Sequence, residues 1–147
     1  MLFLSCIFIS DCHKQKDIEL KKEIVDAVIF ANSLEKIIWA SPEKFNSRKI
    51  IFDHYRKGFS KEIAFRMTDH TWSDSLGLKA GDYATWPPDN VFVIKYDKNF
   101  ATAYYETDEV FRDDITWNRG KYSIVNLRKE NNQWIIFAAT VSDKIPK

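Results

Sequence analysis

Two adjacent residues, Asp69 and His70, form the pair best suited to chemistry, and Asp74 follows closely. A histidine beside a carboxylate is a common general base, because the carboxylate tunes the imidazole to titrate near neutral pH. A purely structural interpretation competes with this one. Side chains of neighbouring residues on a helix diverge by about 100°, and a histidine near a helix C-terminus is stabilised by the helix dipole. The residues alone leave both interpretations open.

Other patterns that carry chemistry are missing from the sequence. The three histidines stand apart, without the short spacing of a metal site. Both cysteines, Cys6 and Cys12, lie in the first twelve residues, so residues 13–147 offer no thiol for catalysis, a disulfide or a metal cluster. There is no glycine-rich phosphate loop and no serine-nucleophile motif. We therefore expect no metal and no cofactor.

Three helices are expected to position the Asp69–His70 pair at the end of the third. The first, residues 17–39, has one apolar face, because its apolar residues recur at three- and four-residue steps. A second helix is expected to begin at Ser41-Pro42 and to stop at Gly58, and a third to begin at the cap residue Ser60 and end near Trp72. The apolar face of the first helix consists of Leu20, Ile24, Ala27, Val28, Ala31, Leu34 and Ile38.

Four antiparallel strands are expected in the second half, with a tight turn at residues 130–132 before the last of them. The last strand is apolar on both faces, which is typical of a central strand or of one covered by helices on one side and by protein or lipid on the other. The expected strands are residues 91–96, 100–110, 121–129 and 133–141.

Residues 73–90 are expected to form a long loop, and it carries two large aromatic residues, Tyr83 and Trp86. They would form a lid over a pocket or seal one open end of the core. The chain is rich in aromatic residues, with 11 Phe, 6 Tyr and 5 Trp, and such side chains often line pockets. The candidates for ligand binding are Trp72, Tyr83, Trp86 and Tyr104.

Composition and element order bound the class of protein. A chain of 147 residues with 45% hydrophobic and 29% charged residues is expected to form one globular domain. A net charge of +1 and the lack of a basic stripe argue against nucleic acid as a partner. Helices followed by an antiparallel meander predict an α+β fold, in which a curved four-stranded sheet curls around the helices.

The N-terminus begins with ten almost wholly apolar residues, followed by a polar stretch. This run is too short to span a bilayer, which takes about 20 residues, but it has the length of the hydrophobic part of a signal peptide, about 7–15 residues. With Cys12 at the apolar-to-polar boundary, the segment resembles a bacterial lipoprotein signal, in which cleavage leaves a lipid-bearing cysteine. Cys6 is the other candidate for lipidation.

This resemblance implies export to the cell envelope and membrane attachment through a lipid on Cys12. The alternative is a first helix or strand that packs on the domain. The expected organisation is a signal or lipoprotein-like segment at residues 1–12, a linker at residues 13–16 and a single domain at residues 17–147.

The sequence from Gly120-Lys121-Tyr122 through Glu130-Asn131-Asn132-Gln133-Trp134 resembles the closing hairpin of the NTF2-like, cystatin-like α+β superfamily. The resemblance implies a cone-like sheet around a long helix, with an opening at its wide end. In enzymes of that superfamily an acid or histidine lies inside the cone near a tyrosine or tryptophan donor. Here Asp69 and His70 would be the acid–base pair, with Tyr104 or Tyr83 as the donor.

We predict a non-enzymatic, envelope-associated protein that binds a small apolar ligand or a protein partner through a cone-shaped pocket or a sheet face. The alternative is a small NTF2-like enzyme of isomerase or hydrolase type that uses Asp69 and His70. An enclosed His70 would favour the enzyme. Exposed aromatic residues on the sheet, such as Tyr104 or Tyr122, would favour pairing through that face, and a homodimer is one such arrangement.

Overall fold

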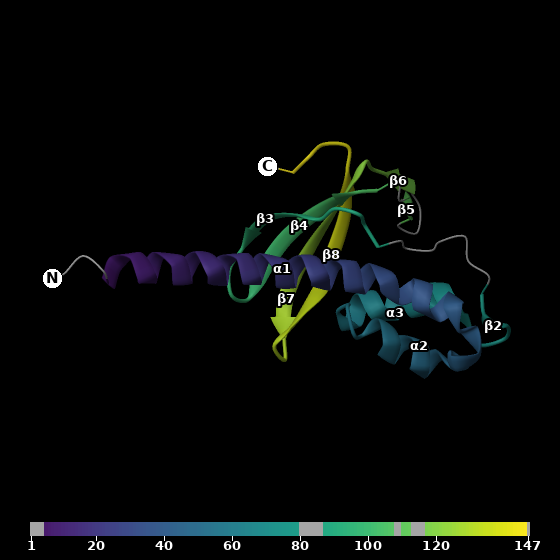
Figure 1. The fold of residues 1–147 in the computed structure, drawn as a ribbon. Coiled ribbons are helices and arrows are strands. Elements are labelled where there is room, and N and C mark those ends of the chain that lie inside the picture. Colours follow the sequence, from purple (N-terminus) through teal and green to yellow (C-terminus); the bar gives the residue numbers. More distant parts are fainter. Residues whose placement is uncertain (1–4, 80–86, 108–109, 113–116, 147) are drawn as a thin grey trace.

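The computed structural model describes residues 5–79, 87–107, 110–112 and 117–146 (Figure 1). Its helical half precedes its strands, so the expected α+β order is confirmed. The helical elements are α1 (Ser5–Ala40), the 3-10 turn η1 (Pro42–Lys44), α2 (Arg48–Tyr55) and α3 (Lys61–Thr71). The main sheet has the order β3 (Phe92–Tyr96), β4 (Phe100–Glu106), β7 (Tyr122–Glu130) and β8 (Gln133–Ser142), and all its pairs are antiparallel.

Two further pairs of short strands stand apart from the main sheet. They are β1 (Trp72–Ser73) with β2 (Gly77–Leu78), and β5 (Val110–Arg112) with β6 (Trp117–Arg119). The first pair is a correction, because residues 73–90 were expected to be one structureless loop. A positive φ of 74° at Gly77 allows the tight return. Tyr83 and Trp86 lie outside the described residues.

The sheet does not curl around the helices, so the expected cone is not formed. Helix α1 crosses one face of the sheet, and α2 and α3 lie together beyond it (Figure 1). Small residues under α1, Ala101 and Ala103 on β4, let the helix lie close to the strands without the sheet bending around it. Four strands that meet a helix on one face leave the opposite face open rather than enclosing a cavity.

Helix α1 is longer than expected and runs through residues 13–16, which were expected to be a linker. Neither glycine nor proline occurs between Ser5 and Lys16 to interrupt a helix. Its first part projects past the sheet, and contact with the body begins near Asp17, whose carboxylate accepts a hydrogen bond from the Tyr96 hydroxyl (Figure 1). That bond, with the ammonium of Lys21, holds the pKa of Asp17 below its usual value.

The second helix begins later than expected. Ser41 and Pro42 start only the short turn η1, while Ser47 caps α2 by accepting a hydrogen bond from the Ile50 amide at 3.3 Å. Phe45 lies between η1 and α2, and its side chain packs into the core with 7% of its surface exposed. This inward position separates the two helical elements. The cap at Ser60 is confirmed, since its hydroxyl accepts from the Ile63 amide at 3.4 Å.

The last strand lies at the end of the strand order and not at its centre. Its outer edge is nevertheless occupied, because the connection between α2 and α3 pairs with Ile136. The Ser60 amide donates to the Ile136 carbonyl at 2.8 Å, and the Ile136 amide donates to the Gly58 carbonyl at 2.9 Å. The tight turn before β8 is confirmed, with Asn131 and Asn132 at φ of 50° and 63°.

The core lies between α1 and the covered face of the sheet. The predicted apolar face of α1 supplies its buried residues, from Ile24 to Ile38. Val125 and Leu127 on β7 and Ile136 on β8 meet them from the sheet. A buried hydrogen bond of 3.1 Å from the Tyr105 hydroxyl to the Asn32 side chain fixes the helix against β4.

Candidate functional site

The acid–base candidates lie near the end of α3 and are not held in one pocket. The Asp69 carboxylate forms an ion pair with Arg48 of α2, and His70 is exposed. Tyr104 lies on β4 and faces away from α1. Among the described residues, the arrangement therefore offers no enclosed site in which Asp69, His70 and a tyrosine meet.

The aromatic ligand-binding candidates are also divided between regions. Trp72 packs at the margin of the core, and its indole donates a hydrogen bond to Asp74 at 3.1 Å. Tyr104 belongs to the uncovered face of the sheet. Trp72 and Tyr104 therefore do not line a common pocket.

His54, by contrast, is a core histidine. It is 7% exposed, its Nε2 lies 2.9 Å from the Leu34 carbonyl, and its ring stands edge-on to Phe45 with centroids 4.8 Å apart. Burial lowers the pKa of His54, which favours the neutral imidazole. This histidine joins α2 to α1 and has a structural role.

The face of the sheet opposite α1, here named the open face, carries the main concentration of unburied aromatic side chains. Alternation along each strand places its residues there, since Ala101, Ala103 and Tyr105 point toward α1. None of the described helices lies across its centre. The open face comprises Phe92, Lys95, Phe100, Thr102, Tyr104, Glu106, Tyr122, Ile124, Asn126, Arg128, Phe137, Ala138, Thr140 and Ser142, together with Ile135, which lies opposite Arg128 and is buried.

Three rings form a ladder across three strands of the open face. Phe92 on β3 stacks on Tyr104 of β4, with centroids 5.1 Å apart and planes 20° apart. Tyr104 meets Tyr122 of β7 edge-on at 5.9 Å. Phe92 keeps 52% of its surface exposed and the two tyrosines are half-buried, so the ladder is ordered by its own contacts yet open to an incoming group.

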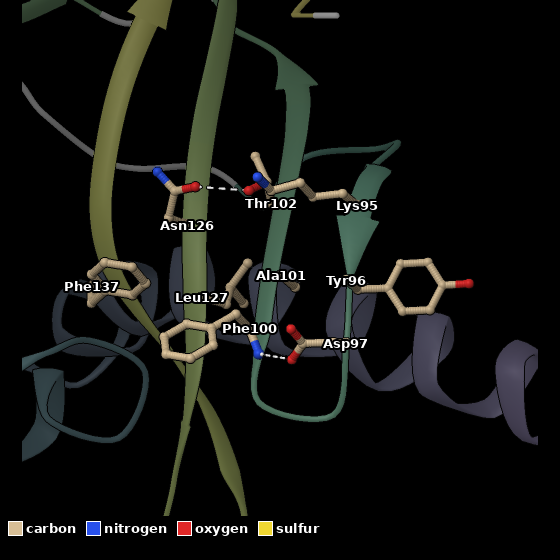
Figure 2. Close-up of a pocket in the computed structure, with 9 residues that line it drawn as sticks. All are labelled: Lys95, Tyr96, Asp97, Phe100, Ala101, Thr102, Asn126, Leu127 and Phe137. Carbon is tan, nitrogen blue, oxygen red and sulfur yellow. Dashed lines mark hydrogen bonds between the residues drawn. The ribbon is translucent and has the colours of Figure 1, made fainter.

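Beside the ladder, the open face has a shallow depression of about 380 Å³ (Figure 2). Phe100 and Phe137 flank it, and its polar lining consists of Lys95, Asp97, Thr102 and Asn126. The Thr102 hydroxyl donates to the Asn126 side-chain oxygen at 2.9 Å, and the Asn126 amide group can still donate to a partner. Figure 2 shows the depression in front of the strands, with α1 behind them. It could hold one side chain of a partner.

The ends of the open face each carry an ion pair within the chain, whereas the exposed Lys95, opposite Thr102, has no ion-pair partner among the described residues. At one end Glu106 lies 3.5 Å from Lys121, whose pKa is raised by Tyr122 and Glu106. At the other end Arg128 lies 2.7 Å from Glu130, and this contact lowers the pKa of Glu130. The open face thus combines an aromatic centre with neutralised ends.

A second depression, of about 450 Å³, lies between α1 and the β7–β8 turn. Lys129 bridges it, 3.1 Å from the Glu23 carboxylate and 5.3 Å from the centre of the Trp134 ring. The Trp134 indole nitrogen is buried without a hydrogen-bond partner in the described part of the chain. The charged lining consists of the Lys129–Glu23 ion pair and the exposed Asp26 carboxylate.

The sequence reasoning singled out Tyr104 and Tyr122 as residues to watch on the sheet, but it missed Phe92, Phe100 and Phe137. A signal was present: Phe100, Thr102 and Tyr104 alternate with Ala101 and Ala103, so β4 has no strongly polar face in its centre. Nothing in the residues tells which of two such faces a helix covers.

Comparison with known proteins found no match: no family model, no curated protein and no solved structure is similar to the chain. Within the described residues there is no group of His, Cys, Asp and Glu suited to a metal ion. None of the described helices is long and apolar enough to cross a membrane.

Proposed function

We propose that the protein is a non-enzymatic binding module whose open face holds a protein partner. The observation that carries this proposal is the ladder of Phe92, Tyr104 and Tyr122 on a sheet face that no described helix crosses. Partner binding requires no proton transfer, in keeping with the pairing of Asp69 to Arg48 and the exposure of His70.

The physical argument rests on the cost of leaving such a face in water. Monomeric proteins rarely expose contiguous apolar patches beyond a few hundred Å², and larger patches usually mark interaction surfaces. Aromatic residues and arginine are enriched in the centres of protein interfaces. The open face fits this composition, with Arg128 lying 5.2 Å from the centre of the Phe137 ring.

The depression between Phe100 and Phe137 supports a protein partner over a small apolar ligand. Small-molecule sites usually enclose most of the ligand surface, whereas this depression is shallow and lies on the flat of the sheet (Figure 2). An apolar side chain projecting from a partner would fill it and would leave the Thr102–Asn126 hydrogen bond intact.

We further propose that the protein works at the cell envelope, exported and attached to the membrane through a lipid on Cys12. The support is the apolar run in residues 1–10, with Cys12 at its end. Because α1 is helical from Ser5, a lipid on Cys12 would sit on the projecting end of a helix rather than on a flexible linker. One acyl chain binds membranes weakly, so stable attachment needs more than one.

The proposal is tested by placing a photo-crosslinking amino acid at position 104, and at Phe65 as a control, in the organism's own cells. Phe65 on α3 is 52% exposed, so it reports chance contact of an exposed aromatic residue. We expect polypeptide adducts from position 104 and few from position 65. Equal yields, or no adduct at position 104, would contradict partner binding by the open face.

A further inference from the structure

The middle of the open face carries a row of three polar side chains, here named the donor row, whose free groups are mainly hydrogen-bond donors. It consists of Lys95 on β3, Thr102 on β4 and Asn126 on β7, which are successive cross-strand partners. Figure 2 shows the Lys95 side chain reaching across β4 toward Thr102. Because the Thr102 hydroxyl donates to the Asn126 side-chain oxygen, the Asn126 amide group and the Lys95 ammonium are left to donate elsewhere.

We propose that the donor row binds a carboxylate, so that the partner of the open face is a polypeptide segment with an acidic side chain between two apolar ones. This inference rests on the proposed function and names the chemistry of the partner. A carboxylate accepts hydrogen bonds at both oxygens and donates none. It therefore supplies the acceptors that Lys95 and Asn126 lack within the described part of the chain, and its charge is opposite to that of Lys95.

A partner without an acceptor at this place is disfavoured. Covering the open face removes water from the two donors, and an ammonium or amide group that loses water without gaining an acceptor destabilises the complex. An ion pair between Lys95 and a partner carboxylate instead becomes stronger when neighbouring rings exclude water, because the effective dielectric constant falls. The donor row thus selects against a purely apolar partner and for an acidic one.

The residues on either side of the donor row set the pattern of the partner segment. Along β4, Thr102 lies two residues from Tyr104 of the ladder and two residues from Phe100, which flanks the depression. Two residues of a strand span about 7 Å, and side chains at alternate positions lie on the same side. An extended segment with apolar, acidic and apolar residues at alternate positions therefore meets the ladder, the donor row and Phe100 in turn.

One carboxylate of the chain itself also lines the depression, and it limits where an acidic group can bind. Asp97 lies between β3 and β4, and its Oδ1 accepts hydrogen bonds from the Asn99 and Phe100 amides at 2.7 and 2.9 Å. These bonds lower the pKa of Asp97 and keep its carboxylate ionised. A partner carboxylate is repelled by Asp97 and attracted by Lys95, which places it over the donor row rather than at the β3–β4 turn.

A two-dimensional NMR titration of the full chain with three synthetic peptides tests this inference. The peptides are acetyl-Phe-Ser-Glu-Ser-Phe-amide and its two counterparts with Gln or Lys in place of Glu. The side-chain amide resonance of Asn126 reports binding at the donor row, and that of the exposed Asn131 in the β7–β8 turn is the internal control. We expect the Glu peptide to shift the Asn126 resonance and to bind at least about 5-fold more tightly than the Gln peptide, the effect of one exposed ion pair.

Substitutions at Lys95 connect this preference to the donor row. Lys95→Gln should abolish the preference for the Glu peptide, whereas Lys95→Arg should keep it because the charge remains. Lys98→Gln is the matched control, since Lys98 is an exposed lysine of the β3–β4 turn that does not line the depression. Asn126→Asp keeps the oxygen that accepts from Thr102 but replaces the amide donor by a second carboxylate, so it should weaken binding of the Glu peptide.

The proposal is overturned if the three peptides bind equally, if the Lys peptide binds best, if no peptide shifts the Asn126 resonance, or if Lys95→Gln keeps the preference. Shifts of the same resonance that depend on protein concentration without any peptide would assign the face to a second copy and would also overturn it. Photo-crosslinking at position 104 distinguishes this failure from failure of the proposed function. Adducts there without a preference for the Glu peptide leave a partner that is not acidic, whereas neither adducts nor a preference removes both proposals.

Discussion

Only one face of the main sheet is covered by α1, and the aromatic side chains of the two faces differ in burial: Tyr105 is buried under the helix, whereas Phe92 is exposed. On the covered face, Ala101 and Ala103 are small and buried under the helix. On the open face, Phe92 and Tyr104 pair across strands at the same level of the sheet. Small residues allow close approach of a helix, whereas the large rings on the other side contribute little to the core of a single chain. Under the proposed function, the covered face stabilises the chain and the open face binds the partner.

The difference between the two faces is tested most directly by substitutions at two positions on β7. Leu127 is fully buried on the covered face, and Ile124 is half-buried on the open face. Leu127→Ala should lower the free energy of unfolding by about 2–5 kcal/mol, because it leaves a cavity. Ile124→Ala should cost no more than about 1 kcal/mol when measured by urea denaturation at low concentration. Equal losses would show that the open face also stabilises the monomer.

A smaller effect is expected where the helices meet on the covered side. A Cβ on Gly58 would lie 2.8 Å from the Ala31 Cα, a backbone atom of α1 that cannot move aside cheaply. Gly58→Ala should therefore cost about 1–3 kcal/mol through overpacking, with the exposed neighbour substitution Lys57→Ala as control. If Gly58→Ala and Lys57→Ala unfold at the same urea concentration, the close contact with α1 does not exclude a side chain at position 58.

The smallest expected effect is a pH dependence of stability that arises from the buried His54. Because burial lowers the pKa of His54, the unfolded chain binds more protons than the folded one below the ordinary histidine value of about 6.5. The stability that neutral His54 contributes is therefore fully present above a pH of about 6.5 and is lost progressively as the pH falls below that value.

Thermal unfolding of the wild type and His54→Gln at pH 7.5 and pH 5.5 measures this contribution. The glutamine amide can still donate to the Leu34 carbonyl but does not titrate. The loss of stability between the two pH values should be smaller in His54→Gln. An unchanged difference would assign the pH dependence to other groups.

Local patterns predicted the elements that local physics controls. The apolar face of α1, the Ser60 cap and the turn at Asn131 and Asn132 follow from spacing, capping and turn chemistry. The same reasoning was wrong where a distant contact decides the outcome. Phe45 separates η1 from α2 because it packs on His54, a contact that helix-start signals do not encode.

The candidate site was harder to predict for the same reason. Asp69 and His70 are neighbours in sequence, but the carboxylate pairs with Arg48 of another helix. Tyr104 was chosen as a donor or pocket residue, and its ring instead stacks on Phe92 of the adjacent strand. Partners at long sequence separation depend on strand register and helix packing, which single-residue patterns do not specify.

By itself the sequence determined that helices precede an antiparallel meander, that one face of the first helix is buried, and that the strands lack a clearly polar side. Only the tertiary structure decided which face of the sheet α1 covers, and therefore that Phe92, Tyr104 and Tyr122 lie on the open one. The physical reason is that strand alternation separates residues into two sets, whereas the burial of either set depends on a helix more than 50 residues away in the chain.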